Sequence, residues 1–446
     1  MRIRLDIPLS LSEVCTAVDG KLTGDDATVN FVCTDSRKVE CGDLFIAITG
    51  MRYNGNDFAH EVRSKGAYVI GQKDASIFVT STEAAMLRIA SLYKSKLPFL
   101  KHTVAITGSI GKTTTKELSK KILSTKYKVH ANHENFNNSI GLFHTVLSAD
   151  KQTEVLIIEM GMNHSGEISQ LSQAVTPDVA IITNIGTAHI GNLGSREAIA
   201  EAKLEIRDGM TGGVHIIPYG EPLLSLGRTV SVDQSDGYYN LHIHNVDQNK
   251  SIFSFYGGTI VLNEERVALV GAHLMTALAF AISIAEVCKL NENDIRRGIS
   301  QIDQSCLRQK RMQVGKYDVY DDTYSSSPEA AAATIKALAQ QFPGSVSAVL
   351  GDMLELGEHS APLHSKLGKI AAECGIRRLY LFGSFSEHVK TGALSAGMDE
   401  DCIFTNTDGD IELTANNIRE TYNGELLIVK ASHNVHAERL FDFLKD

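Results

Sequence analysis

The chain has 446 residues, which exceeds the usual size of one hydrophobic core and predicts two to four domains. Its hydrophobic fraction of 43% and charged fraction of 22% are typical of an ordinary globular protein. The formal net charge is -10 and no basic block is present, which argues against nucleic acid as a partner.

The cysteines are scattered, odd in number and never spaced as C-x-x-C, so reduced thiols in a cytoplasmic protein are the simplest interpretation. The first residues lack the long apolar region of a signal peptide. Residues 267–285 carry no Asp, Glu, Lys or Arg and are long enough to span a bilayer. Their Ala-rich composition and strand-like start instead favour a strand end followed by a buried helix, without membrane insertion.

Residues 1–100 alternate short apolar runs with helical patterns, which predicts strands at 43–48 and 68–70 and a helix at 81–93. Polar clusters at 34–37 and 50–55 combine turn residues with arginine. Such clusters suit a small anionic ligand, but they are equally typical of ordinary loops.

Residues 103–116, T-V-A-I-T-G-S-I-G-K-T-T-T-K, place a Gly-rich turn between an apolar strand and the start of a helix. This is the arrangement of a phosphate-binding loop, in which backbone N–H groups face an anion. Lys112 would contact the outer phosphates, and the Thr113 hydroxyl would contact Mg²⁺. Ile106 stands where the common pattern has its first glycine, so the loop is the shorter variant G-x-x-G-K-T. A chance Gly-Lys-Thr turn is the alternative, which the flanking strand and helix disfavour.

The rest of the chain continues the alternation of strands and helices. Apolar runs at 155–159 and 179–183 fit a parallel sheet covered on both faces, as in a doubly wound α/β domain. After Gly220, an antiparallel insertion or edge is predicted. Beyond residue 312 the βα rhythm resumes, with a helix that starts at Pro328 and is capped by Ser327. The predicted strands of these two regions lie at 241–244, 251–255, 259–262, 318–320, 347–350, 379–382 and 426–430.

Three residues that follow the phosphate loop in the sequence are candidates for metal binding or catalysis. Glu159 ends an apolar strand where phosphate-loop enzymes place an acidic Mg²⁺ ligand, and a solvent-facing acid is the less favoured alternative. His189, in T-N-I-G-T-A-H, could be a general base or a metal ligand, although a lone histidine is more often a plain loop residue. Lys203 lies in a helical segment and, by itself, would be a surface lysine.

Together these pieces resemble the Mur ligases, the ATP-dependent amide-forming enzymes of peptidoglycan assembly, over essentially the whole chain. The resemblance is greatest to the type that adds D-alanyl-D-alanine to UDP-N-acetylmuramoyl-tripeptide. The motifs that carry it, besides the phosphate loop, are D-S-R (35–37), G-D-L-F-I-A (42–47), N-F-N-N-S-I-G (135–141), E-M-G-M-N-H-x-G-E-I (159–168), T-N-I-G-T-A-H (183–189), A-K-L-E-I (202–206) and G-D-M-L-E-L-G (351–357).

The resemblance implies a three-domain α/β architecture. Residues 1–100 would bind the UDP-sugar acceptor, 101–312 would form a central parallel-sheet ATPase domain, and 313–446 a Rossmann-like domain for the amine. It implies a monomer that acts on two small-molecule substrates, a UDP-muramoyl-peptide and a dipeptide. It also implies that ATP first converts the acceptor carboxylate, a poor electrophile, into an acyl phosphate, which the amine then attacks.

The resemblance also implies roles for particular residues, with Lys203 carbamylated by CO₂ so that its carboxylate holds a second Mg²⁺. Catalysis would use Lys112, His189, Lys203 and Asp322, and the metals would bind Thr113, Glu159, His189 and Lys203. ATP would contact Gly108, Ser109, Gly111, Lys112, Thr113, Thr114, His273 and Arg308. The substrates would contact Ser36, Arg37, Asn135, Asn138, Tyr324 and Lys430.

Several positions depart from the family pattern. The asparagines of H-N-x-x-N are missing after His273, Y-S-S-S-P at 324–328 replaces Y-N-A-N-P, K-A-S-H at 430–433 replaces K-G-S-R, and Asn56 replaces a usual histidine. The arginine that heads the third domain is Arg308 or Arg311, and its spacing to Asp322 favours Arg308. Because Arg clamps a carboxylate with two donors and His433 does not, weaker binding of D-alanyl-D-alanine, or preference for a related amine, is predicted.

Two alternatives remain open. One is a paralogue that joins a different amine or acceptor in specialised metabolism, and the other is a catalytically weak, Mur-like binding subunit. A phosphate-loop kinase or motor explains Glu159, His189 and Lys203 together less well.

Overall fold

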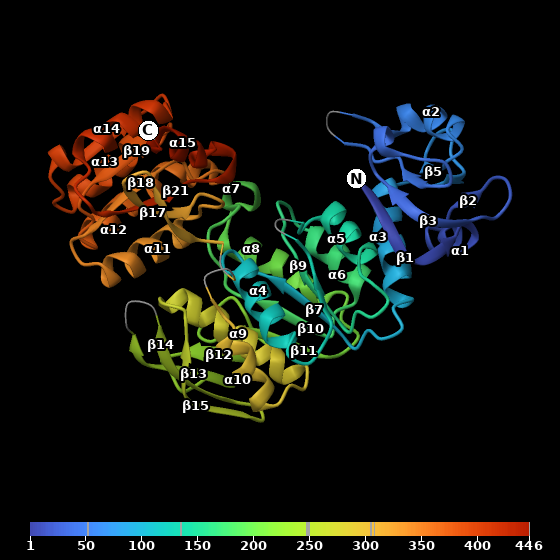
Figure 1. Ribbon diagram of the computed structural model, residues 1–446, viewed down its shortest axis with the longest axis horizontal. Helices are drawn as coiled ribbons and strands as arrows, with labels where there is room; N and C mark the ends of the chain where they lie inside the picture. The colour runs from blue at the N-terminus through green and yellow to red at the C-terminus, as the bar shows by residue number, and fades with distance from the viewer. Residues whose placement is uncertain (51–52, 134–135, 247–249, 304–305, 307, 446) are drawn as a thin grey trace.

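The computed structural model describes residues 1–446 except 51–52, 134–135, 247–249, 304–305, 307 and 446. The described strands form three sheets in turn along the chain, and Figure 1 shows the first and last at opposite ends, above the middle one. We call the regions around them the N-terminal unit (residues 1–100), the central unit (101–303) and the C-terminal unit (310–446). The predicted α/β class is confirmed, and domain divisions near residues 100 and 312 remain our proposal.

The N-terminal sheet has the order β1-β3-β4-β5-β6-β2, parallel from β3 to β6 with antiparallel edges. Its elements are β1 (Arg2–Ser10), α1 (Leu11–Ala17), β2 (Lys21–Leu22), β3 (Thr28–Cys33), β4 (Leu44–Ile46), α2 (Ala59–Ser64), β5 (Tyr68–Gly71), β6 (Ile77–Phe78) and α3 (Thr82–Ser95). Helix α3 confirms the helix predicted at 81–93, and the Ser81 hydroxyl caps it by accepting a hydrogen bond from Ala84 N at 3.2 Å. Strand β1 is absent from the sequence predictions, although buried Ile3 and Leu5 alternate with polar side chains.

The central sheet has the order β15-β14-β13-β12-β11-β10-β7-β9-β8 and is parallel from β8 to β13. Its strands are β7 (His102–Thr107), β8 (Val129–Ala131), β9 (Val155–Glu159), β10 (Val179–Ile182), β11 (Val214–Pro218), β12 (Arg228–Val232), β13 (Tyr239–Val246), β14 (Ser251–Gly257) and β15 (Ile260–Val267). Its helices are α4 (Lys112–Leu123), α5 (Ser139–Leu147), α6 (Glu167–Val175), α7 (Ile190–Leu193), α8 (Arg196–Leu204), α9 (Ala272–Val287) and α10 (Glu292–Ser300).

Helices cover both faces of the parallel part of this sheet, because successive strand side chains point to opposite sides. Val104 and Ile106 belong to the core formed with α4, α9 and α10, whereas Ala105 belongs to the core formed with α5, α6 and α8. With both faces covered, every residue of β9 is buried. The apolar runs at 155–159 and 179–183 are thereby confirmed as internal parallel strands.

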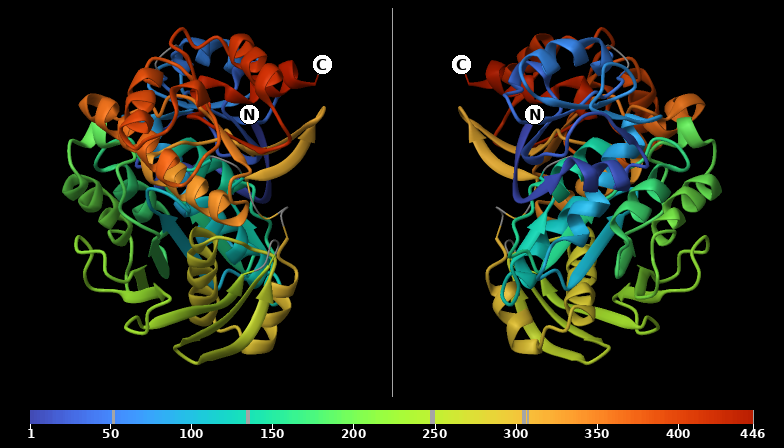
Figure 2. Two further views of the ribbon diagram at one scale, coloured as in Figure 1. Left: turned by 90° about the vertical axis from the view of Figure 1, so that its left-hand side faces the viewer. Right: turned by 90° about the vertical axis from the view of Figure 1, so that its right-hand side faces the viewer.

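The predicted antiparallel edge is also confirmed, because β13, β14 and β15 pair in antiparallel fashion. In both views of Figure 2 these yellow-green strands lie at the bottom of the molecule. Residues 267–285 divide as predicted, since β15 ends at Val267 and the buried helix α9 begins at Ala272. Within the described residues, no helix combines the length and hydrophobicity that a membrane span requires.

The C-terminal sheet has the order β16-β17-β21-β18-β19-β20 and is parallel except for the β16–β17 pair. Its elements are β16 (Lys310–Val314), β17 (Tyr317–Asp322), α11 (Pro328–Gln341), β18 (Val346–Leu350), α12 (Ser360–Glu373), β19 (Leu379–Phe382), α13 (Ser386–Ser395), β20 (Ile403–Asn406), α14 (Ile411–Thr421), β21 (Leu426–Lys430) and α15 (Leu440–Leu444). As predicted, α11 starts at Pro328, and the Ser327 hydroxyl accepts a hydrogen bond from Ala330 N at 3.3 Å.

Within the central unit, a polar cluster joins strands β12 and β13 to helix α9. The Tyr239 hydroxyl on β13 donates to Glu286 Oε2 on α9 at 2.8 Å. Arg228 on β12 donates to the same hydroxyl at 2.8 Å and to Glu286 at 3.2 Å. Burial raises the pKa of Tyr239, so its hydroxyl stays protonated and serves as a donor.

Substitution of Tyr239 by Phe should therefore destabilise the central unit. Tyr239→Phe removes one donor from the buried Glu286 carboxylate, and we expect the free energy of unfolding to fall by about 1–3 kcal/mol in urea titrations. Tyr256→Phe is the control, because Tyr256 is 39% exposed and bonds Asn263 at the surface. Equal stability of the two variants would contradict a structural role for this cluster.

Candidate functional site

The phosphate loop lies between β7 and α4 and has the backbone that its glycines predict. Gly108 has φ of 147° and Gly111 has φ of 79°, both in the left-handed region that favours glycine. A Cβ on Gly108 would lie 1.9 Å from Thr183 Oγ1, so a side chain at this position has no space. Thr183 Oγ1 itself donates a hydrogen bond to Ile110 O at 2.5 Å. The phosphate loop is thus held by the first residue after the neighbouring strand β10.

Lys112 begins α4 and folds over this loop. Its Nζ donates to Gly108 O at 2.7 Å, which keeps the ammonium beside the loop's anion-binding face. Burial lowers the pKa of Lys112, and the nearby charge of Arg308 lowers it further while Glu159 opposes the shift. Two positive groups gathered at one place favour a multiply charged anion there.

Thr113 and Glu159 form the candidate metal position. The Thr113 hydroxyl donates to Glu159 Oε2 at 2.7 Å, and Asn137 Nδ2 donates to Glu159 Oε1 at 3.1 Å. Glu159 is only 2% exposed. No group of three His, Cys, Asp or Glu side chains that could hold a metal occurs in the described part of the chain. One carboxylate and one hydroxyl still fit Mg²⁺, since Mg²⁺ in nucleotide sites takes its other ligands from phosphates and water.

His189 lies on the loop that leads into α7, opposite the C-terminal unit. Its Nδ1 is 2.5 Å from Glu355 Oε2, and both side chains line the cleft that contains the phosphate loop. Its φ of 66° is unusual for a residue other than glycine. Its role as a metal ligand or a base stays a prediction.

The helical sequence around Lys203 suggested a surface lysine, but the structure buries this residue. It lies on α8 and is only 2% exposed. Burial lowers the pKa of Lys203 well below its usual value, and the positive charge of Lys112 lowers it further. None of the described side chains forms a hydrogen bond or an ion pair with its amine. This environment favours the neutral, nucleophilic amine.

The C-terminal unit contributes a second cluster. Lys430, 2% exposed, lies 2.8 Å from Asp322 Oδ2 and donates to Ser325 O at 2.6 Å. The Tyr324 ring contacts the Arg308 guanidinium at 3.9 Å and lies 5.2 Å from the His433 ring, centroid to centroid. The Lys430 ammonium thus has two partners within its own unit.

A cleft of about 340 Å³ between the central and C-terminal units brings most of the predicted residues together. It is lined by Ser109, Gly111, Lys112, Thr113, Thr114, Glu159, His189, Arg308, Asp322, Tyr324 and Lys430, among others. Gly108 lies in the loop behind these residues, and Lys203 and His273 do not line this cleft.

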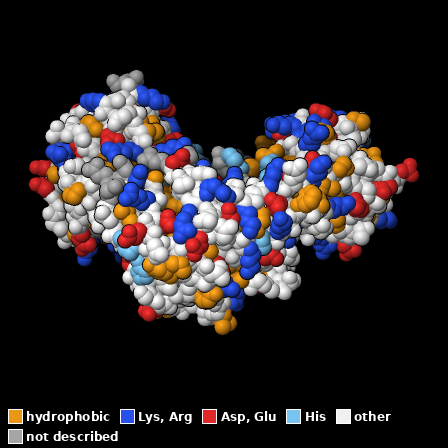
Figure 3. Space-filling view, turned by 60° about the horizontal axis from the view of Figure 1, so that its bottom comes forward, with side chains coloured by type: hydrophobic (Ala, Val, Ile, Leu, Met, Phe, Trp, Pro, Cys, Tyr) orange, Lys and Arg blue, Asp and Glu red, His pale blue; other side chains and the backbone are white. Residues whose placement is uncertain are grey.

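The remaining predicted contacts lie elsewhere. Ser36 and Arg37 follow β3 in the N-terminal unit, which Figure 3 shows as a lobe set apart from the rest by a hollow. Arg37 pairs with Asp35 at 2.9 Å. Asn138 caps α5 by accepting a hydrogen bond from Gly141 N at 2.9 Å, and Asn135 lies outside the described residues. The amide that contacts Glu159 is Asn137, from the same N-F-N-N motif.

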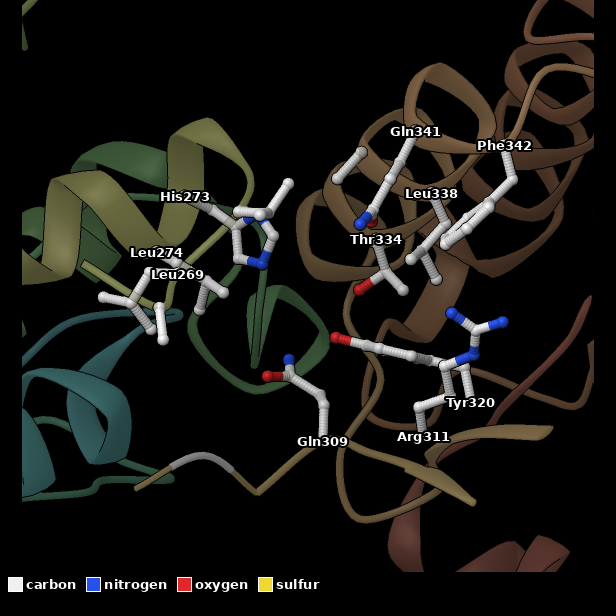
Figure 4. Close-up of a pocket in the computed structure, with 13 residues that line it drawn as sticks. Leu269, His273, Leu274, Gln309, Arg311, Tyr320, Thr334, Leu338, Gln341 and Phe342 are labelled. Atoms are coloured by element: carbon white, nitrogen blue, oxygen red, sulfur yellow. The ribbon is translucent and has the colours of Figure 1, made fainter. Parts of the chain in front are cut away.

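A smaller cavity of about 80 Å³ lies beside His273, between the start of α9 and helix α11. Figure 4 shows His273 on one side, Thr334 and Tyr320 on the other, and Gln309 reaching in from the connecting segment. His273 Nε2 and Gln309 Oε1 are buried, and neither has a hydrogen-bond partner among the described residues. Both side chains also line a pocket beside Gly111 and Thr114 of the phosphate-loop region. Gln309 was not predicted, because nothing in its sequence context marks it.

Three family models match the chain. Residues 28–103 match the Mur ligase family, catalytic domain, residues 106–285 the Mur ligase middle domain, and residues 308–434 the Mur ligase, glutamate ligase domain.

Two curated relatives align over nearly the whole chain. The UDP-N-acetylmuramoyl-tripeptide--D-alanyl-D-alanine ligase of Bacillus subtilis (strain 168) is 32% identical, and the alignment covers 97% of this chain and 98% of the relative. The protein of the same name from Treponema pallidum (strain Nichols) is 33% identical, with 98% and 99% covered.

The solved structures agree with this result. MurF from Acinetobacter baumannii superposes with a TM-score of 0.88 at 26% identity, covering 100% of both chains. The MurF ligase from Thermotoga maritima in complex with ADP gives 0.79 at 26% identity, covering 93% of this chain and 96% of that chain. On the strength of full-length relatives above 30% identity and of this common fold, the chain belongs to the Mur ligase family.

Proposed function

We propose that this protein is an ATP-dependent ligase that joins D-alanyl-D-alanine to UDP-N-acetylmuramoyl-tripeptide in the synthesis of peptidoglycan precursors. The observation that carries the proposal is the cleft in which the phosphate loop, Glu159 and His189 of the central unit face Asp322 and Tyr324 of the C-terminal unit. The names of the full-length relatives supply the substrates. We expect the protein to act as a monomer in the cytoplasm, where nucleotide-linked precursors and ATP are available.

The chemistry has two steps. The terminal carboxylate of the tripeptide attacks the γ-phosphorus of ATP, ADP leaves, and an acyl phosphate forms. The amine of the dipeptide then attacks the acyl carbon, phosphate leaves, and the amine loses a proton. Lys112 and the loop N–H groups stabilise the charge on the transferring phosphoryl group, and the docked C-terminal unit shields the acyl phosphate from water.

Thr113, Glu159 and His189 are the proposed ligands of one Mg²⁺, and a carboxylate on Lys203 is the proposed ligand of a second. When bound, Mg²⁺ would offset the repulsion between the phosphate oxygens and the incoming carboxylate. We propose that the buried amine of Lys203 bonds to CO₂ and releases a proton, which gives a carbamate with one negative charge. This modification would turn a buried amine into an oxygen ligand, the type that Mg²⁺ prefers.

We propose that the adenine base of ATP binds in the pocket between the phosphate loop and His273. His273 Nε2 and Gln309 Oε1, both buried and unpartnered among the described residues, face the pocket beside the phosphate loop. They would supply polar contacts to adenine in place of the asparagines that are missing after His273.

The direct test is phosphate release with ATP, UDP-N-acetylmuramoyl-tripeptide and D-alanyl-D-alanine, with Lys112→Ala as the critical variant. We expect Lys112→Ala to lower kcat by about 100- to 1000-fold, because it removes a charge that acts on the transferring phosphoryl group. Lys120→Ala, exposed on the same helix α4, is the control and should retain parental activity. Near-normal turnover of Lys112→Ala would exclude a catalytic role for the loop.

Lys203→Ala should be nearly inactive and should regain part of its activity when a short carboxylate such as formate is added. The added carboxylate can take the place of the missing carbamate as a metal ligand. The same compound should not rescue Lys112→Ala, whose defect is a lost positive charge. Full activity of Lys203→Ala without any additive would contradict the carbamate.

A related amine is the second candidate for the incoming substrate, because His433 stands where the family has an arginine. We expect His433→Arg to lower KM for D-alanyl-D-alanine by about tenfold, since an arginine can donate two hydrogen bonds to the dipeptide carboxylate. KM for ATP should not change and serves as the internal control. If KM for the dipeptide is unaltered, the carboxylate is recognised elsewhere.

A further inference from the structure

The C-terminal unit contacts one loop of the central unit through a carboxylate of α11. This loop, residues 183–189, leads from β10 to α7. Glu329, in the first turn of α11, accepts two hydrogen bonds from Thr187, from the backbone N at 2.8 Å and from Oγ1 at 2.9 Å. A backbone donor of the central unit is therefore satisfied by a side chain of the C-terminal unit.

A second carboxylate contacts the end of the same loop. Glu355 Oε2 lies 2.5 Å from His189 Nδ1, and the backbone O of Glu355 accepts a hydrogen bond from Gly191 N at 3.0 Å. The backbones here are in direct contact, because a Cβ on Gly191 would lie 2.5 Å from Gly357 N. Glu355 has φ of 64°, which is unusual for a residue other than glycine. Figure 1 shows α7 reaching up to the C-terminal unit.

The loop that receives these contacts also supports the phosphate loop. Gly186 N donates to Ser109 Oγ at 2.9 Å, and Asn184 Oδ1 accepts a hydrogen bond from Ile110 N at 2.9 Å. Gly186 is enclosed between the two units, since a Cβ there would lie 2.9 Å from Glu329 Cδ and 3.1 Å from Ser109 Cβ. A single backbone residue therefore separates the carboxylate of Glu329 from the phosphate loop.

We propose that Glu329 and Glu355 are positioning residues that make phosphoryl transfer depend on docking of the C-terminal unit. Through them, docking fixes residues 186–189, and these in turn fix Ser109 of the phosphate loop and the ring of His189. A carboxylate that contacts one ring nitrogen of a histidine commonly orients the other ring nitrogen toward a functional site. The inference rests on the proposed ligase function, because it assigns these residues to that reaction.

The coupling must also act in the opposite direction. If docking orders the phosphate loop, a nucleotide that orders the loop must favour docking by the same factor. ADP should therefore increase the docked population of the native protein, and loss of both carboxylates should remove this response. This consequence can be measured without any turnover.

The kinetic test compares Glu329→Ala and Glu355→Ala with Glu329→Gln and Glu355→Gln. We expect each alanine variant to lower kcat by about 10- to 100-fold, as is typical for partners that orient a functional side chain, with a smaller change in KM for ATP. Glu329→Gln keeps an oxygen that can accept both hydrogen bonds from Thr187, and Glu355→Gln keeps an oxygen beside His189 Nδ1, so both should stay within a few-fold of the parent. Glu358→Ala is the matched control, because Glu358 is in the same segment with its side chain 91% exposed.

The binding test uses small-angle scattering of the full chain with and without ADP. We expect ADP to make the parent and Glu358→Ala more compact. The double variant that carries both Glu329→Ala and Glu355→Ala should show no such change. Alanine variants that match Glu358→Ala in both kcat and compaction would overturn the proposal, as would glutamine variants as impaired as the alanine variants. If the parent releases no phosphate with any substrate, the proposed function fails, whereas the ADP response still decides whether the two carboxylates couple docking to the nucleotide site.

Discussion

The close approach of Gly108 to Thr183 is the constraint on which the site depends. The turn between β7 and α4 can present its N–H groups to an anion only when its backbone adopts the left-handed conformations seen at Gly108 and Gly111. The strand next to β7 in the sheet is β10, and the loop that follows β10 holds this turn through Thr183 and Asn184. Parallel pairing of β7 with β10 therefore places two loops, far apart in sequence, at the same edge.

Basic side chains are buried around this turn at a cost to the stability of the folded protein. Lys112 and Lys203 are both desolvated, and the charge of Lys112 lowers the pKa of Lys203. Lysines in such surroundings are unfavourable for stability in themselves but favourable for binding phosphate or reacting with CO₂. Glu159 is a buried acid that lines the same cleft as Lys112, and hydrogen bonds from Thr113 and Asn137 fix the position of its carboxylate.

The cleft is completed by residues from a different sheet. Asp322 ends β17 and Lys430 ends β21, and these adjacent parallel strands bring the two residues to 2.8 Å. The carboxyl ends of the strands of the C-terminal sheet thus face the phosphate loop of the central sheet across one cleft. Ligands commonly bind at this edge of open α/β sheets, which explains why a reaction between two substrates can use two such sheets.

The sequence by itself determined the α/β class, the phosphate loop and the strand at whose end Glu159 lies. These features are local: glycine-rich turns, continuous apolar runs and the change from strand to helix are all visible within about ten residues. The antiparallel edge and the cap of α11 were predictable for the same reason. Strand β1 was missed, although its alternation is similarly local.

Only the tertiary structure decided which of these residues meet. Lys203 has the local pattern of a surface residue, and its burial depends on how α8 packs under the central sheet. Gln309, Glu329 and Glu355 gain their positions from contacts between units that are far apart in the chain. The local sequence carries no signal for such contacts. The packing of whole sheets and helices decides which residues of two units meet, and the neighbours of a residue in the sequence do not.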